Sequence, residues 1–317
     1  MTQEMSPSNR RTVGFAFVLL AAISWSLAGI GIKSVPLTSL AIVGWRSLLA
    51  LPVFVLVLFG RTASATGPAL RLALVRPATW AAALVYTWTM LSFVLASKWT
   101  TAANAILLQY TAPIYVVLLS WPLLREKVTG ADILAVMGCF AGIVWFFLGQ
   151  ISTTGLYGNL LALSSGLGLG LLPLLLRRAE RPAPSTSPRD KTLLPFMPTC
   201  VLLLGNVLAF FCGLPAMATA RVTGASVWVW LFLLGVVQVA LAYLFYAAAV
   251  RRLRPVECLM VATLEPILNP LWVALGTGER PSRTAVIGGV LIVFSVVSHG
   301  IYVGLGKADK FSPSAPV

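Results

Sequence analysis

The sequence carries little charge, and acidic residues are especially scarce. Only 10% of its 317 residues are Asp, Glu, Lys or Arg; nine of these are acidic, and there is one histidine. An average soluble domain has roughly 25% charged residues, so this composition excludes an ordinary soluble fold. Hydrophobic residues make up 58% of the chain and the mean hydropathy is +0.91, which indicates a protein that resides in lipid.

Signatures of enzymatic and ATP-driven chemistry are also absent. The sequence has no Walker motif, no HExxH and no Asp-rich motif, and its four cysteines form no CxxC pair. Catalysis and primary active transport by this chain therefore lack the residues they need. We expect no enzyme activity, no cofactor and no metal; a membrane-embedded lipid-modifying enzyme is the weakest alternative.

Long apolar runs dominate the sequence. A transmembrane helix needs about 20 residues to cross ~30 Å of hydrocarbon. Continuous runs satisfy their backbone groups as helices and lack the alternation of barrel strands, so we predict an all-α integral membrane protein with ten transmembrane helices. The runs lie at 13–32, 38–59, 78–96, 101–122, 131–149, 156–176, 192–213, 226–248, 256–276 and 284–305, with sizeable loops at 60–77 and 177–191.

The net charge of +14 reflects where the basic residues lie between these runs. If the N-terminus is cytoplasmic, 17 Lys and Arg residues fall inside and 5 outside, with Arg46 left within a span. This is the bias of the positive-inside rule. We therefore predict a multi-pass protein of the cytoplasmic (inner) membrane with both termini in the cytoplasm, and no nucleic-acid partner.

The two halves of the sequence repeat each other. With a shift of 153 positions, Pro113 falls on Pro266 and Glu126 falls on Glu279. Each half holds five spans, and an odd number makes the second half enter the membrane from the opposite side. Inverted repeats of this kind are the architecture of alternating access.

These observations predict two inverted five-helix repeats. The first repeat covers 13–149 and the second 150–305, with the loop 177–191 in the cytoplasm. The tails 1–12 and 306–317 are predicted to be cytoplasmic as well.

The stretch LEPILNP, residues 264 to 270, interrupts the ninth run. Glu265 lies near its middle, where a charged side chain costs about 2.5 to 3.5 kcal/mol. Pro266 removes the helix partner of the Ala262 carbonyl. Because matching helix breaks point to the substrate site, we predict that Pro113 and Pro266 are gating positions and that Glu265 binds substrate and couples protons. A neutral Glu265 bonded to a neighbouring helix is the alternative.

Other polar and aromatic side chains lie deep in the runs. Their amide and hydroxyl groups could form hydrogen bonds with a substrate, although hydrogen bonds between helices are an equally common role for such groups. Asn269 follows Glu265 by four residues, on nearly the same helix face. The predicted substrate-binding residues are Gln109, Tyr110, Glu265, Asn104, Asn269, Tyr86, Trp88 and Trp25.

Three ionisable residues are given other roles. We expect the long stem of Arg46 to carry its guanidinium to the outer interface, with anion binding or gating as the alternative. Glu257 is expected in an interfacial ion pair with nearby arginines. For His299 we expect packing or a bond to a neighbouring helix, with a proton relay as the alternative.

Two segments resemble the paired signatures of the EamA family in the drug/metabolite transporter superfamily. They are ANAILLQYTAPIYVVLLSWPLLREK, from Ala103, and RPVECLMVATLEPILNPLWVALGTGERPS, from Arg254; the earlier GFAFVLLAAISWSLAGIGIK and GWRSLLALPVFVLVLFG resemble the family as well. The resemblance implies a ten-helix bundle in which the fourth and ninth helices cross near the centre. It also implies a cavity among helices one, three, six and eight, and transport of small metabolites.

The sequence therefore predicts a secondary transporter that works by alternating access. We expect it to export an amino acid, a related compound or a drug-like molecule; a flippase or transporter of lipid-linked intermediates is the alternative. The expected partners are this small molecule and membrane lipid. Gly138 and Gly142 have a small-xxx-small spacing, which we assign to packing within a monomer in preference to a dimer interface.

Overall fold

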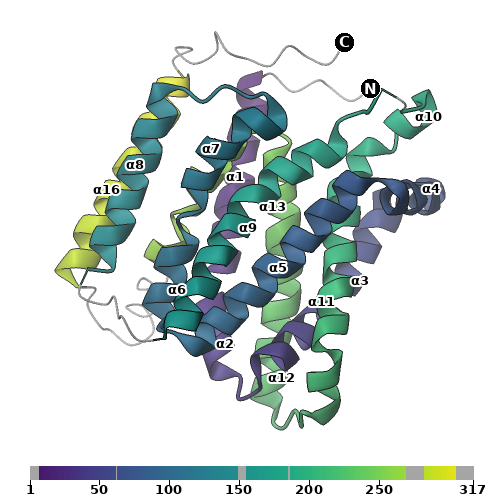
Figure 1. Ribbon diagram of the computed structural model, residues 1–317, viewed down its shortest axis with the longest axis horizontal. Coiled ribbons are helices and arrows are strands. Elements are labelled where there is room, and N and C mark those ends of the chain that lie inside the picture. Colours follow the sequence, from purple (N-terminus) through teal and green to yellow (C-terminus); the bar gives the residue numbers. More distant parts are fainter. Residues whose placement is uncertain (1–6, 62, 149–154, 185, 269–281, 305–317) are drawn as a thin grey trace.

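The computed structural model describes residues 7–61, 63–148, 155–184, 186–268 and 282–304. Within these ranges the regular structure is helical and no strand occurs, as expected for a chain whose backbone groups must be satisfied in lipid (Figure 1). The elements are α1 (Pro7–Trp25), α2 (Ala28–Ser34), α3 (Ser39–Arg61), α4 (Ala63–Val75), α5 (Pro77–Trp99), α6 (Ala102–Gln109), α7 (Ala112–Leu124), α8 (Gly130–Phe146), α9 (Leu156–Glu180), α10 (Pro188–Lys191), a 3₁₀ turn (Leu194–Phe196), α11 (Met197–Thr219), α12 (Ala225–Phe232), a π-helical segment (Leu233–Leu241), α13 (Ala242–Val250), α14 (Pro255–Ala262) and α16 (Arg283–Gly304).

Many of these helices are apolar enough to cross a membrane. In the described part of the chain eight helical stretches qualify by length and composition, and α8 is a shorter apolar helix of 17 residues. The ninth predicted run, 256–276, is described only as far as residue 268. The chain is thus a multi-pass membrane protein, whereas the count of ten spans stays a prediction.

Helices α8 and α16 lie side by side at one edge of the bundle (Figure 1). Their backbones approach closely: a Cβ added at Gly142 would lie 2.7 Å from a side-chain carbon of Ile292, and one at Gly288 only 2.4 Å from the backbone nitrogen of Phe146. Gly138 faces Ser295 in the same interface. The spacing of Gly138 and Gly142 thus serves packing within the chain.

The larger part of the bundle is built around α5. This helix packs between α9 and α11, α3 packs on α11 and on the π-helical segment, and α1 packs on α13. Tyrosines Tyr86, Tyr243 and Tyr246 and many small alanines fill the space between them. The interior therefore brings the first, second, third, sixth, seventh and eighth predicted runs together.

Two helices are broken at matching places. The run predicted at 101–122 divides into α6 and α7, with Tyr110 and Thr111 between them and Pro113 in the first turn of α7. Likewise α14 ends at Ala262, and helix resumes over 265–268 with Pro266 in its first turn. Proline is tolerated in a first turn because the N–H that it lacks has no partner there.

The helices that precede the two breaks have matching boundaries in the sequence. Helices α6 and α14 are both eight residues long, and α14 starts and ends 153 positions after α6. The offset that aligns the two halves of the sequence therefore also aligns the observed helix ends.

The expectation of a loop at 60–77 is wrong, because α4 occupies most of it. This stretch is rich in Ala and Leu, which favour helix, and its residues Thr66, Ala69 and Ala73 are buried against neighbouring helices. The 177–191 loop is also shorter than expected, since α9 continues to Glu180 and α10 begins at Pro188. α4 and α10 lie at the end of the bundle where α1 begins (Figure 1).

Candidate functional site

A small cavity of about 30 Å³ lies where the helices around α5 meet. A water molecule needs roughly 10 to 15 Å³ of such space, so the cavity holds about two waters and no metabolite in this conformation. It is lined by Trp25, Ala28, Arg46, Thr89, Met90, Phe93, Gln109, Leu169, Gln238, Tyr243 and Glu265. Three of the predicted substrate-binding residues, Trp25, Gln109 and Glu265, are therefore brought together.

Glu265 is held by Tyr110, the residue at the break between α6 and α7. The Tyr110 hydroxyl lies 2.5 Å from Oε2 of Glu265 and 2.9 Å from the carbonyl oxygen of Ala262. Pro266 cannot donate to that carbonyl, so Tyr110 replaces the missing helix partner. The two helix breaks and the carboxylate thus form one hydrogen-bonded unit.

Gln109 is fixed by bonds that run across two neighbouring helices. Its Nε2 donates to Oγ of Ser165 on α9 at 2.9 Å, and that hydroxyl donates to the carbonyl of Thr89 on α5 at 3.1 Å. These bonds place the amide of Gln109 at the wall of the cavity.

Arg46 is turned into the bundle, so the expectation that it reaches the outer interface is wrong. It is only 2% exposed and lines the cavity. The π-helical segment packs tightly beside it, since a Cβ added at Gly235 would lie 2.7 Å from the Arg46 carbonyl oxygen. Nε and Nη1 of Arg46 have no hydrogen-bond partner among the described residues.

Gln238 and Tyr243 are lining residues that the sequence reasoning did not select. Gln238 lies within the π-helical segment, a kind of helical irregularity that is frequent at functional sites. Its Oε1, like Nε1 of Trp25, is buried without a hydrogen-bond partner in the described chain. Gln238 could have been selected from the sequence on the same ground as Gln109, because it is a polar residue deep in an apolar run.

The aromatic rings around the cavity support one another. Trp25 meets Tyr243 edge-on with ring centroids 5.1 Å apart, and Tyr86 meets Tyr243 at 4.7 Å. Tyr86 is buried behind the lining and accepts a 2.9 Å bond from Nδ2 of Asn206. Tyr86 therefore packs against Tyr243 and helps to hold that ring at the cavity.

The other predicted site residues lie elsewhere. Trp88 is 48% exposed on the outside of the bundle. Asn104 donates to Oδ1 of Asn159 at 2.9 Å and so links α6 to α9. Pro113 is buried in α7, and Asn269 lies outside the described residues.

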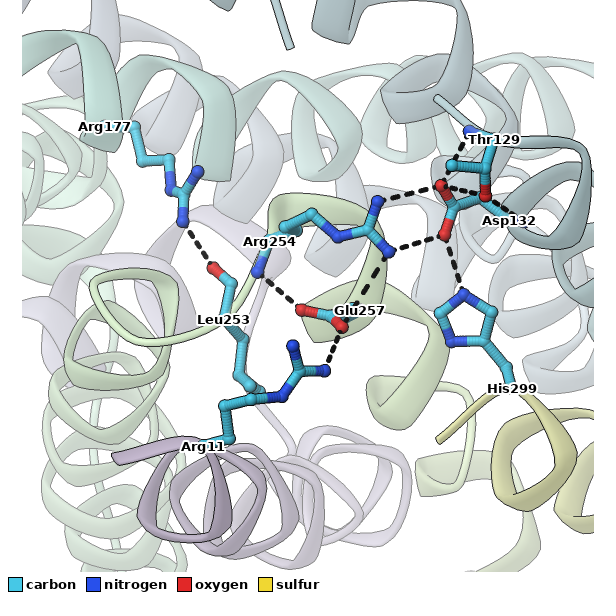
Figure 2. A network of polar contacts seen from close by, with 8 residues as sticks. All are labelled: Arg11, Thr129, Asp132, Arg177, Leu253, Arg254, Glu257 and His299. Carbon is cyan, nitrogen blue, oxygen red and sulfur yellow. Dashed lines mark hydrogen bonds and ion pairs between the residues drawn. The ribbon is translucent and has the colours of Figure 1, made fainter. Parts of the chain in front are cut away.

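A second polar cluster ties four helices together through Arg254 (Figure 2). The guanidinium of Arg254 donates to both oxygens of Asp132, at 2.7 and 2.9 Å, and His299 bonds to the same carboxylate at 2.7 Å. Burial lowers the pKa of Arg254, but the bonds to Asp132 and the charge of Glu257 outweigh it and raise the pKa above its ordinary value. His299 thus bonds to a neighbouring helix, as expected.

Glu257 completes this cluster from the first turn of α14. It accepts a 2.6 Å ion pair from Arg11 of α1 and a 2.8 Å bond from the backbone nitrogen of Arg254 (Figure 2). The expected ion pair at Glu257 is present, but its short partner is Arg11, while the nearby Arg254 lies 3.8 Å from the carboxylate. The cluster connects α1, α8, α14 and α16, and it does not line the cavity.

These features define a multi-pass helical membrane protein with a polar cavity beside two broken helices. The chain belongs to the EamA-like transporter family, whose model matches residues 12–148 and 156–299. It is 27% identical over 209 residues to an uncharacterized transporter of Archaeoglobus fulgidus, which covers 66% of this chain and 71% of that protein. A crystal structure of another protein has the same fold, with a TM-score of 0.73, 19% identity, and coverage of 93% of this chain and 98% of that one. The resemblance to the EamA family is thereby confirmed.

Proposed function

We propose that this chain is a secondary transporter that exports a small metabolite across the cytoplasmic membrane by alternating access. The observation that carries the proposal is the cavity, where polar atoms of Arg46, Gln238 and Trp25 are buried without hydrogen-bond partners in the part of the chain that the structure describes. Intramembrane polar residues are costly and commonly mark a substrate pathway. Gln109 and Glu265 line the same space and would contact the substrate.

Two inverted five-helix repeats would supply the motion. The matched breaks after Gln109 and Ala262 support this arrangement, as does the match of the family model once in each half of the chain. A cavity with space for about two waters fits a contracted conformation that enlarges when one mouth opens. The ion pairs of the Arg254 cluster would then lie at the cytoplasmic end, with both termini.

Glu265 is the proposed proton-coupling residue. A hydroxyl has one hydrogen to donate, yet the Tyr110 hydroxyl is within reach of both Glu265 and the Ala262 carbonyl. An ionised Glu265 would accept a hydrogen bond from the Tyr110 hydroxyl. A protonated Glu265 could instead donate to the Tyr110 oxygen, and the Tyr110 hydroxyl would then donate to the Ala262 carbonyl. The protonation of Glu265 would thereby change the bonding at the helix break.

Transport by purified protein in liposomes tests the proposal. Radiolabelled amino acids are assayed for counterflow, and fluorescent lipid is assayed for flipping in the same vesicles. We expect counterflow that falls at least tenfold in Gln109→Ala protein and is retained in Trp88→Ala protein, because Trp88 lies outside the cavity. Lipid flipping without counterflow would instead support the lipid-transport alternative.

A further inference from the structure

Two side chains that line the cavity carry hydrogen-bond donors without acceptors in the described chain. Arg46 and Trp25 are both more than nine-tenths buried, and Nε and Nη1 of Arg46 and Nε1 of Trp25 lack acceptors in the described chain. Arginine keeps its charge in proteins, so it cannot relieve its burial by losing a proton. Two of the three nitrogens of this buried guanidinium therefore lack an acceptor among the described residues, and an anionic ligand would supply one.

The carboxylate in the same cavity does not relieve it. No ion pair within 4.0 Å joins Arg46 to an acidic residue in the described ranges. Glu265 is instead bonded to Tyr110. The cavity thus contains a cationic and an acidic group that are not paired with each other.

We propose that Arg46 binds a carboxylate of the transported substrate, and that Glu265 holds a hydrogen-bond-donating group of the same molecule. This inference rests on the proposed function, which it deepens by naming the substrate class. Trp25 Nε1 supplies a further donor near the cavity wall, and Gln238 Oε1 supplies a further acceptor. Met90, Phe93 and Leu169 give the rest of the lining an apolar surface for the body of the substrate.

The charges of the site favour a monoanionic carboxylate over a phosphate. One guanidinium offsets a single negative charge, and it matches the planar carboxylate with its forked donors. A phosphate group of nearly two negative charges would keep an uncompensated charge and would also meet Glu265. An ammonium on the substrate, by contrast, satisfies Glu265 and brings the net charge of the ligand to zero.

Four probes that share one apolar body separate the contributions of the two ends. L-leucine carries both groups, 4-methylpentanoate has the carboxylate alone, and L-leucinamide and isopentylamine have the ammonium without a carboxylate. Binding to the full-length purified protein is measured by the rise in Tm, because a ligand that binds only the folded form raises it. We expect L-leucine to bind most tightly and both probes without a carboxylate to bind at least tenfold more weakly.

Substitutions at Arg46 assign the effect to this side chain. Arg46→Gln should abolish the preference for L-leucine over L-leucinamide, and Arg46→Lys should retain part of it. The matched control is Arg10→Gln, at an exposed arginine, which should behave as wild type. Equal binding of L-leucinamide and L-leucine, an undiminished preference in Arg46→Gln protein, or no Tm rise with either carboxylate probe overturns the inference.

Transport of the same four probes separates this inference from the proposed function. If L-leucine enters liposomes at the same rate with wild-type and Arg46→Gln protein, the chain is a transporter and the role of Arg46 in binding the carboxylate is refuted. If a carboxylate binds through Arg46 but none of the probes crosses the membrane, the binding site stands and transport of them is refuted.

Discussion

Tyr110 bridges the two broken helices: its hydroxyl lies 2.5 Å from the Glu265 carboxylate and 2.9 Å from the Ala262 carbonyl oxygen. The tyrosine stands at the end of α6, while both acceptors belong to the break after α14. Each break is therefore stabilised by contact with the other. A movement of one broken helix relative to the other must change these bonds.

Tyr110→Phe should destabilise the protein. The substitution leaves the Ala262 carbonyl and Glu265 buried without this donor, which costs about 1 to 3 kcal/mol. Chemical denaturation in detergent measures the loss. Tyr157→Phe is the control, because Tyr157 is 77% exposed and should change stability by less than about 0.5 kcal/mol. Equal stabilities for the two variants would remove the bridging role of Tyr110.

Glu265→Gln should uncouple transport from the proton gradient. Glutamine cannot exchange a proton, and the neighbouring Arg46 keeps its charge. In liposomes, we expect wild-type counterflow to respond to an imposed pH difference and the variant to be insensitive to it. Glu180→Gln, which alters an acidic residue paired with Arg251, should respond as wild type. A full pH response from Glu265→Gln protein would rule out coupling at this residue.

Arg46→Met should make the substrate-free protein more stable. Arg46 has no acidic partner among the described residues, so replacing this buried charge by an apolar side chain of similar length removes its desolvation cost, with an expected gain of about 1 to 4 kcal/mol. The same variant should lose carboxylate binding. Unfolding measurements without ligand show whether the free energy of unfolding of the variant is higher or lower than that of the wild type. A loss of about 3 kcal/mol would mean that Arg46 has a structural partner in the folded state.

Asp132→Asn should loosen the attachment of α8 and α16 to the rest of the bundle. Asp132 is completely buried and binds both Arg254 and His299. Removing one partner of a buried pair costs about 3 to 5 kcal/mol; we expect the lower value because Arg254 is partly exposed. Asp190→Asn is the control, since Asp190 bonds to Ser187 at the surface. Similar Tm values for both variants would show that the cluster contributes little.

The sequence predicted the parts of the fold that depend on hydrophobicity and proline. Within the described residues the long apolar runs are helical, and Pro113 and Pro266 marked two breaks with matching boundaries. It did not predict α4. That helix follows a membrane-length run, and its buried face can be recognised only from the helices that cover it.

The candidate site was predicted less completely. Glu265 and Gln109 could be selected because polar groups are rare in the spans, but the direction of a side chain depends on helix rotation, which composition does not fix. Arg46 could reach either the interface or the interior, and the rotation of α3 places its side chain in the interior beside the cavity. Trp88 also lies deep in its predicted run, but the rotation of α5 places its side chain on the outer surface.

The most direct test of the central claim is thiol labelling in intact membrane vesicles. Single cysteines replace Gln109, at the cavity wall, or Trp88, on the outer surface, after the four native cysteines have been replaced. A membrane-impermeant, water-soluble thiol reagent should modify the cysteine at 109 as the cavity opens to water and leave the one at 88 unmodified in lipid. Modification at 88 with none at 109 would contradict a water-accessible chamber beside the paired breaks.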